Sequence, residues 1–162
     1  RTLNLDPLVV VSPDVGSIKL ARATAKALNA ELAIVDKRRP RPNQAQIMNL
    51  IGNVEGKNIL IRDDMVDTAG TICQAAHFLK ERGARDIYAA ATHGVLSGNA
   101  ITRIIESPIK TMIITDSIDH SGKPLTDKFE ILTCSELIGE ATKRIFDEES
   151  VSSLFEDQPL VV

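Results

Sequence analysis

The residues best suited to chemistry in this sequence form a short acidic and hydroxyl-rich segment at positions 63–71, which reads Asp-Asp-Met-Val-Asp-Thr-Ala-Gly-Thr. A short apolar run precedes it and a helical pattern follows it. A tight polar loop between a strand and a helix binds anions, because its N–H groups converge on the ligand and the helix dipole attracts negative charge. We expect Gly70 to let the backbone approach closely, and Thr68 and Thr71 to add hydroxyl donors. Residues 67–71 are therefore a candidate phosphate site.

Two adjacent carboxylates, Asp63 and Asp64, stand just before this loop. They would repel a bare phosphate, so their expected targets are neutral hydroxyl groups or a bound cation. A sugar phosphate offers vicinal hydroxyls to the carboxylates and a terminal phosphate to the loop. The alternative interpretation is an ordinary strand-to-helix turn whose surface Asp residues cap the helix.

Two other segments carry chemistry of the same kind. Asp14 lies in a second small polar loop, Ser-Pro-Asp-Val-Gly-Ser at 12–17, directly after an apolar strand. Residues 36–43, Asp-Lys-Arg-Arg-Pro-Arg-Pro-Asn, are the most charged and least regular part of the chain, and their prolines forbid helix and disfavour a central strand. One interpretation is a solvated basic loop. The position beside two candidate phosphate loops favours a mobile arm that closes over polyphosphate.

The elements that must position these residues follow from the alternation of apolar runs and helical patterns, which predicts an α/β fold with a mostly parallel sheet flanked by helices. Strands are expected at 8–11, 32–35, 59–61, 86–92, 111–115 and 129–133, and helices at 18–28, 72–83, 99–106 and 135–147. Residues 47–57 are expected to be extended with a turn at Glu55–Gly56, and Ser97 and Ser135 are candidate helix caps. Open sheets of this class bind ligands at the carboxyl ends of their strands, where Asp14, Asp63 and Asp64 are expected.

Bulk properties exclude several classes of function. The length of 162 residues suits one domain, and a net charge of −3 argues against nucleic acid as the main partner. No apolar stretch approaches membrane-spanning length and no signal peptide is visible. Cys73 and Cys134 lack metal-ligand spacing, which favours buried reduced thiols in a cytoplasmic protein. Because the chain opens at Arg1 rather than at a methionine, we expect a fragment of a longer protein.

Four segments, taken in order, resemble the ribose-phosphate pyrophosphokinase (phosphoribosyl pyrophosphate synthetase) family. They are Ser12-Pro13-Asp14-x-Gly16, Asp36-Lys37-Arg38-Arg39-Pro40, the segment 63–71, and Thr92-His93-x-x-x-Ser97-Gly98. The segment 63–71 also resembles the ribose-phosphate loop of phosphoribosyltransferases, and a match of that length disfavours an ordinary turn. The resemblance covers nearly the whole chain but only the second, C-terminal half of the family's protein. It implies a type I phosphoribosyltransferase-like domain at 1–148 and a C-terminal tail at 149–162 that packs on the N-terminal domain of the longer protein.

The chemistry that this resemblance implies is transfer of the diphosphoryl group of ATP to the anomeric hydroxyl of ribose 5-phosphate, which gives phosphoribosyl pyrophosphate and AMP. The implied catalytic residues are Lys37 and Arg39, which neutralise charge on the transferring group. Asp63 and Asp64 hold the ribose hydroxyls directly or through Mg²⁺, and Asp14 is a ligand of Mg²⁺. The residues that the resemblance implies for binding of the 5-phosphate are Asp67, Thr68, Ala69, Gly70 and Thr71.

The resemblance further implies a homo-oligomer regulated by phosphate or ADP, with no nucleic-acid or membrane partner. The isolated chain is expected to be inactive, because in the family the nucleotide site is completed by the first domain and by a neighbouring subunit. Three departures stand out: Ser17 replaces a glycine and is expected to restrict its loop, Leu20 replaces an arginine, and Arg62 replaces an apolar strand residue and is expected at solvent or at a subunit contact. Two alternatives stay open, a phosphoribosyltransferase that consumes phosphoribosyl pyrophosphate and a catalytically silent regulatory partner. The phenylalanines, including Phe146 and Phe155, are expected at packing positions.

Overall fold

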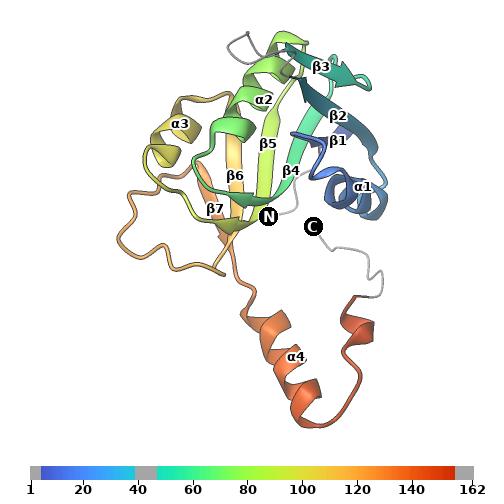
Figure 1. Cartoon of the computed structure of the whole chain (residues 1–162), viewed down its shortest axis with the longest axis vertical. Coiled ribbons are helices and arrows are strands. Elements are labelled where there is room, and N and C mark those ends of the chain that lie inside the picture. The colour runs from blue at the N-terminus through green and yellow to red at the C-terminus, as the bar shows by residue number, and fades with distance from the viewer. Residues whose placement is uncertain (1–4, 39–46, 156–162) are drawn as a thin grey trace.

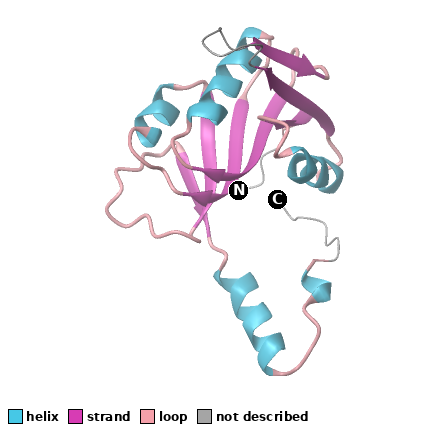
Figure 2. Ribbon diagram, viewed as in Figure 1, coloured by secondary structure: helices cyan, strands magenta, loops and turns pink. Residues whose placement is uncertain are grey.

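A seven-stranded sheet with the order β3-β2-β1-β4-β5-β6-β7 organises the chain (Figures 1 and 2). The computed structural model describes residues 5–38 and 47–155. The strands are β1 (Leu8–Ser12), β2 (Glu31–Arg38), β3 (Ile47–Ile51), β4 (Asn58–Val66), β5 (Ile87–Gly94), β6 (Ile109–Thr115) and β7 (Phe129–Leu132). All neighbouring strands run parallel except β2 and β3, so the mostly parallel α/β sheet expected from the sequence is confirmed.

The helices of the described chain are α1 (Ile18–Ala27), α2 (Gly70–Glu81), α3 (Ala100–Glu106), α4 (Ser135–Phe146) and the short 3-10 turn η1 (Ser152–Leu154). Of these, α1, α2 and α3 cover the two faces of the sheet. In β1, Val10 packs with α1 on one face, whereas Val9 and Val11 belong to the larger core on the other face. That larger core contains Ile72 and Leu79 of α2 as well as residues of α3, so α2 and α3 lie opposite α1. Successive side chains of a strand point to opposite faces, which is why one apolar run serves both layers.

The helix α4 differs from the other three, because none of its residues is buried. Figure 1 shows it projecting away from the sheet, in the orange and red part of the ribbon. Phe146 is 86 % exposed and Phe155, after η1, is 83 % exposed, so the expectation that these two rings lie at packing positions is wrong. The amphipathic pattern correctly predicts the helix, but no described part of the chain covers its apolar face.

Two strands run further than their sequences suggest. β2 continues through Asp36 to Arg38, because the backbone pairs antiparallel with β3. β4 continues through Asp63 and Asp64 to Val66, because it stays in register with β5 as far as the Val66–Gly94 pair. Asp63 and Asp64 therefore lie among the last residues of β4 rather than after its end. The apolar pattern did not predict these longer strands, because their last residues are polar. Hydrogen bonds between main chains form without apolar side chains.

The helix caps also differ from expectation. Asn99 rather than Ser97 precedes α3, and Cys134 rather than Ser135 precedes α4; neither residue makes a side-chain capping hydrogen bond. Ser97 instead accepts, through its main-chain oxygen, a hydrogen bond from the N–H of Ala100. No helix in the described ranges is long and apolar enough to cross a membrane.

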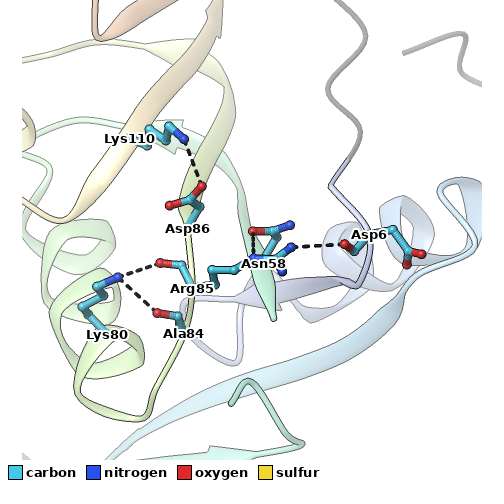
Figure 3. Close-up of polar contacts among 7 residues, drawn as sticks. All are labelled: Asp6, Asn58, Lys80, Ala84, Arg85, Asp86 and Lys110. Carbon is cyan, nitrogen blue, oxygen red and sulfur yellow. Dashed lines mark hydrogen bonds and ion pairs between the residues drawn. The ribbon is translucent and has the colours of Figure 1, made fainter. Parts of the chain in front are cut away.

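The amino-terminal edge of the sheet is closed by polar contacts between loops (Figure 3). Arg85 donates to Oδ1 of Asn58 at 3.0 Å and to the main-chain oxygen of Asp6 at 3.1 Å. Lys110 pairs with Asp86 at 2.9 Å. These bonds join the starts of β1, β4, β5 and β6 to one another.

Candidate sugar-phosphate site

The carboxyl ends of β1 and β4 bring the two polar loops together at the other edge of the sheet. The hydroxyl of Ser17, at the end of the loop that follows β1, donates to Oδ1 of Asp63 at 2.5 Å. This contact joins residues 46 positions apart, and the sequence did not predict it. The φ of Ser17 is −89°, which any L-residue adopts, so Ser17 is not strained in this conformation of the loop.

The loop between β4 and α2 presents unused N–H groups. The first helical hydrogen bond of α2 runs from the N–H of Cys73 to the oxygen of Ala69 at 3.1 Å. Within the described part of the chain, the N–H groups of residues 68–72 donate to no acceptor. Unused N–H groups at a helix start are the donors that bind phosphate. The geometry expected for residues 67–71 is therefore present.

Ala69, rather than Gly70, carries the unusual backbone conformation of this loop. Ala69 has a φ of 61°, in the left-handed region that non-glycine residues seldom adopt. A side chain built at Gly70 would meet only the hydroxyl of Thr68, at an ordinary contact distance of 3.8 Å. The left-handed residue of this loop is therefore Ala69, and the predicted close approach of Gly70 to a ligand stays a prediction.

A cavity of about 160 Å³ lies directly over this loop. It is lined by Asp63, Met65, Val66, Asp67, Thr68, Ala69, Gly70, Thr71 and Ile72. A larger cavity of about 390 Å³ lies at the opposite edge, against Pro7, Leu60 and Tyr88. The smaller cavity is the candidate site, because Asp63 and the residues with unused N–H groups line it together.

The surroundings of Asp63 raise the pKa of its carboxyl group. It is half-buried, and burial raises its pKa, while the hydroxyl of Ser17 and the N–H of Asp64 that donate to it lower the pKa in part. The nearby carboxylate of Asp14 raises the pKa of Asp63 again, because two negative charges repel each other. Asp14 also accepts hydrogen bonds from the N–H groups of Gly16 and Ser17, at 2.9 and 3.2 Å.

The carboxylates of Asp14 and Asp63 both accept hydrogen bonds from Ser17, and carboxylates gathered in this way are suitable oxygen ligands for a cation. In the described residues no group of three or more His, Cys, Asp or Glu side chains is placed to hold a metal ion. A site with one or two protein carboxylates still suits Mg²⁺, which keeps several waters and takes its other ligands from substrate phosphates.

Arg62 makes its hydrogen bonds inside the fold rather than with solvent, and its expected subunit contact stays a prediction. Its half-buried guanidinium donates to the main-chain oxygens of Asp63 and Ala90 and, at 3.1 Å, to the hydroxyl of Thr92. Burial lowers the pKa of Arg62, and the carboxylates of Asp63 and Asp64 raise it in part. Arg62 therefore ties the ends of β4 and β5 together behind the site.

Three carbonyl groups leading into α2 are held by the segment around α3. The N–H of Leu96 donates to Val66, and the N–H of Ser97 donates to Asp67, both at 3.0 Å. The third donor is the Arg103 side chain, whose Nη1 lies 2.9 Å from the oxygen of Thr68. Sequence reasoning singled out the Ser97-Gly98 motif but missed Arg103, because nothing in the local pattern of α3 marks this residue.

The predicted catalytic residues are only partly placed. Lys37 lies on β2, where its backbone pairs with Met48, but its side chain is outside what the structure describes. Arg39 and the rest of the basic segment to residue 46 are also outside the described residues. Lys37 is thus part of a strand rather than of a loop, and its predicted role stays a prediction, as does that of Arg39.

Comparison with known proteins gives a consistent result. The family model described as the phosphoribosyl synthetase-associated domain matches residues 20–156. The chain is 57 % identical over 153 residues to a ribose-phosphate pyrophosphokinase of Chlorobaculum tepidum, covering 94 % of this chain and 47 % of that protein. It is 54 % identical over 155 residues to a protein of the same name from Bordetella pertussis, with 95 % and 50 % covered. The chain spans about half the length of the curated relatives it matches.

Solved structures agree on the fold. The structure of phosphoribosylpyrophosphate synthetase from Mycobacterium smegmatis is similar with a TM-score of 0.81 and 34 % identity, over 88 % of this chain and 46 % of that one. An APRTase from Giardia lamblia is similar with a TM-score of 0.54 and 15 % identity, over 64 % and 66 % of the two chains, which shows the fold alone. The fold is therefore of the type I phosphoribosyltransferase-like class expected from the sequence.

Proposed function

The chain belongs to the phosphoribosyl synthetase-associated domain family, and from this premise we propose that it is one half of a ribose-phosphate pyrophosphokinase, a transferase that acts on ATP and ribose 5-phosphate. The observation that carries the proposal is the loop between β4 and α2, where residues with unused N–H groups and the half-buried Asp63 line one cavity. Relatives that are 54 and 57 % identical and carry this enzyme name support the choice over a phosphoribosyltransferase or a silent partner.

The proposed reaction forms one bond and breaks one. The anomeric oxygen of ribose 5-phosphate attacks the β-phosphorus of ATP, and the bond from that phosphorus to the oxygen bridging to the α-phosphorus breaks. AMP leaves with the bridging oxygen, and the hydroxyl proton is lost to solvent. Such transfers depend on positioning and charge stabilisation more than on a covalent catalyst.

The 5-phosphate is proposed to bind at the start of α2. The N–H groups of Thr68, Ala69, Gly70 and Thr71 have no other acceptor in the described residues, and the two threonine hydroxyls add donors. Asp67 has an exposed side chain at the rim of the same cavity. A bound phosphate would accept several hydrogen bonds at once, which favours a fixed orientation of the sugar.

Asp63 and Asp64 are proposed to accept hydrogen bonds from the ribose hydroxyls. One oxygen of Asp63 is already bonded to Ser17 and to the N–H of Asp64, which leaves its other oxygen for a ligand. Asp14 would hold Mg²⁺ from the neighbouring loop, and the ion, when bound, would neutralise charge on the phosphate oxygens of ATP. The hydrogen bonds that Asp14 and Asp63 both accept from Ser17 support this assignment.

Lys37 and Arg39 are proposed to neutralise charge on the transferring diphosphoryl group. Lys37 lies on β2, two strands away from β4 in the sheet, and Arg39 follows it closely in sequence. Arginine suits two-pronged phosphate contacts, whereas lysine acts as a point charge. Lysine and arginine are both cations, and cations stabilise a transition state that carries several negative charges.

The rest of the longer protein is proposed to complete the site. We assign residues 1–148 to the phosphoribosyltransferase-like domain and 149–162 to a tail that packs, together with α4, on the part of the relatives that this chain does not span. Five apolar residues there are at least 57 % exposed: Leu137, Ile138, Ile145, Phe146 and Phe155. Assembly into an oligomer regulated by phosphate or ADP is part of the proposal, as is slow turnover by this chain alone.

Calorimetric titration of the chain with ribose 5-phosphate tests the proposal. We expect binding that is weakened by about tenfold or more in Asp67→Ala and in Thr68→Val, because each loses a group at the phosphate loop. Thr126 and Asp127, which follow one another in the exposed loop before β7, offer matched controls. Thr126→Val and Asp127→Ala should bind ribose 5-phosphate like the unaltered chain. Equal affinity in all four variants would remove the central assignment.

A further inference from the structure

We infer that Arg103 is a positioning residue for the phosphate loop: it holds the peptide before Ala69 so that the N–H groups of the loop face the cavity. The inference rests on the proposed function for its choice of ligand, but its geometry stands independently. It concerns a side chain of α3 that contacts no proposed substrate group and acts through the backbone of Thr68.

Three successive peptide units lead from β4 into α2, and all three are held in the same way. The carbonyl oxygens of Val66, Asp67 and Thr68 accept hydrogen bonds from Leu96, Ser97 and Arg103 in turn. In a planar trans peptide the C=O and the following N–H point in opposite directions. With the three oxygens turned toward the segment that leads into α3, the N–H groups of the next residues are turned away from it, toward the cavity.

Among these three donors, Arg103 is the one that a substitution can remove. Leu96 and Ser97 donate through their main chain, in a segment that is itself held by Lys123, whose Nζ lies 2.5 Å from the oxygen of Val95 and 3.3 Å from that of Leu96. In the described ranges, Arg103 is the only side chain outside the loop with a hydrogen bond to the main chain of residues 67–69. The orientation of the last of the three peptides therefore depends on one guanidinium group.

The peptide between Thr68 and Ala69 also precedes the residue with the least favourable backbone conformation in the loop. It joins Thr68 to Ala69, and Ala69 has a φ of 61°, a left-handed conformation that its side chain disfavours. Contacts on both sides must keep it there: the oxygen of Ala69 accepts the first helical bond of α2, and the oxygen of Thr68 accepts the bond from Arg103. Without Arg103 the peptide is free to rotate toward a common conformation, which would turn the Ala69 N–H out of the cavity.

The experiment compares Arg103→Ala with Arg82→Ala in the 162-residue chain, with inorganic phosphate, ribose 5-phosphate and ribose as probes. Arg82 is a matched control, because it is an exposed arginine at the far end of α2 that stacks on Phe78 at 4.7 Å. We expect Arg103→Ala to weaken both phosphate ligands about tenfold and to leave ribose unchanged, since only the phosphate uses the N–H groups. Arg103→Lys, which keeps a charge and a donor, should recover part of the loss.

A second measurement separates orientation from charge. The amide signals of Thr68 and Ala69 in a ¹H–¹⁵N spectrum should shift in ligand-free Arg103→Ala and stay in place in Arg82→Ala. The loss of affinity should also persist at high ionic strength, where the effect of a merely nearby charge is screened.

The outcomes distinguish this inference from the proposed function. If the unaltered chain binds both phosphate ligands and Arg103→Ala binds them equally well, the role of Arg103 is overturned and the proposed function stands. Binding of inorganic phosphate but not of ribose 5-phosphate, with loss in Arg103→Ala, would support the role of Arg103 and overturn the proposed substrate. A chain that binds neither ligand at these amides overturns both.

Discussion

The helices α2 and α4 have the same length of twelve residues and each carries an apolar face, yet only the apolar face of α2 is buried. α2 buries six residues against the sheet and α3, whereas α4 buries none. The start of α2 forms the candidate site, and its loop is held by main-chain and side-chain bonds from distant segments. α4 is joined to the domain at its start, where the N–H and thiol of Cys134 both donate to Asp116.

This difference teaches that an amphipathic pattern predicts a helix but not what covers it. Both helices have an apolar face, and for α2 the sheet lies against that face. For α4 the described chain supplies polar contacts instead: Arg144 pairs with Glu140 at 2.7 Å and donates to Ser150 and Ser153 in the tail. No residue within 5–38 or 47–155 buries the apolar face of α4, and the relatives are about twice as long as this chain.

The largest expected effect comes from truncating one leucine in each helix. Leu79 of α2 is 0 % exposed and Leu137 of α4 is 57 % exposed. Leu79→Ala should lower the free energy of unfolding by about 3 kcal/mol, because it leaves a cavity in the core. Leu137→Ala should change it by less than about 0.5 kcal/mol, as exposed substitutions do. Urea denaturation of both variants gives the comparison. Similar losses in the two would show that α4 is packed in solution.

A smaller effect is expected where the site is held by a contact between distant segments. Ser17→Ala removes the hydroxyl that stabilises ionised Asp63, so it should raise the pKa of Asp63 further and cost about 1 kcal/mol of unfolding free energy at neutral pH. The cost should shrink at acid pH, once Asp63 is protonated. A ¹³C titration of the Asp carboxyls measures the pKa. Ser121→Ala is the control, because it should raise the pKa of Asp119 and leave Asp63 unchanged. An unshifted Asp63 in Ser17→Ala would show that the contact is absent in solution.

The smallest effect concerns the link between α4 and the domain. Hydrogen bonds from the Cys134 thiol, the Thr133 hydroxyl and the Cys134 N–H lower the pKa of Asp116 from 3.8 to about 2. Because the pKa is lower in the folded chain, the contribution of Asp116 is present above pH 3.8 and is lost as the pH falls through about 2. The Cys134 amide signal should therefore titrate with a midpoint near pH 2.

Two variants check that this titration belongs to Asp116. Asp116→Asn should abolish it, whereas Asp119→Asn, in the following loop, should leave it in place. A midpoint at the ordinary value of 3.8, or no change in the Cys134 signal, would mean that this link does not hold the start of α4.

Much of the candidate site was predictable, because its parts are local in sequence. The apolar run at 59–61 predicts a strand, and the small polar residues that follow predict a loop at a helix start. The carboxylates Asp63 and Asp64 were placed at the correct edge of the sheet, although they lie within β4 rather than beyond it. Arg62 was noted as unusual, but its partners are on β5, nearly thirty residues away.

The sequence by itself determined the order of strands and helices and the class of the fold, since these depend on periodicity and on turn residues within a few positions. Tertiary structure alone decided three other matters: the bond from Ser17 to Asp63, the hold of Arg103 on Thr68, and the exposure of α4. Each depends on which surfaces meet in space. A hydroxyl, a guanidinium or an apolar helix face has the same local pattern whether or not a partner lies against it.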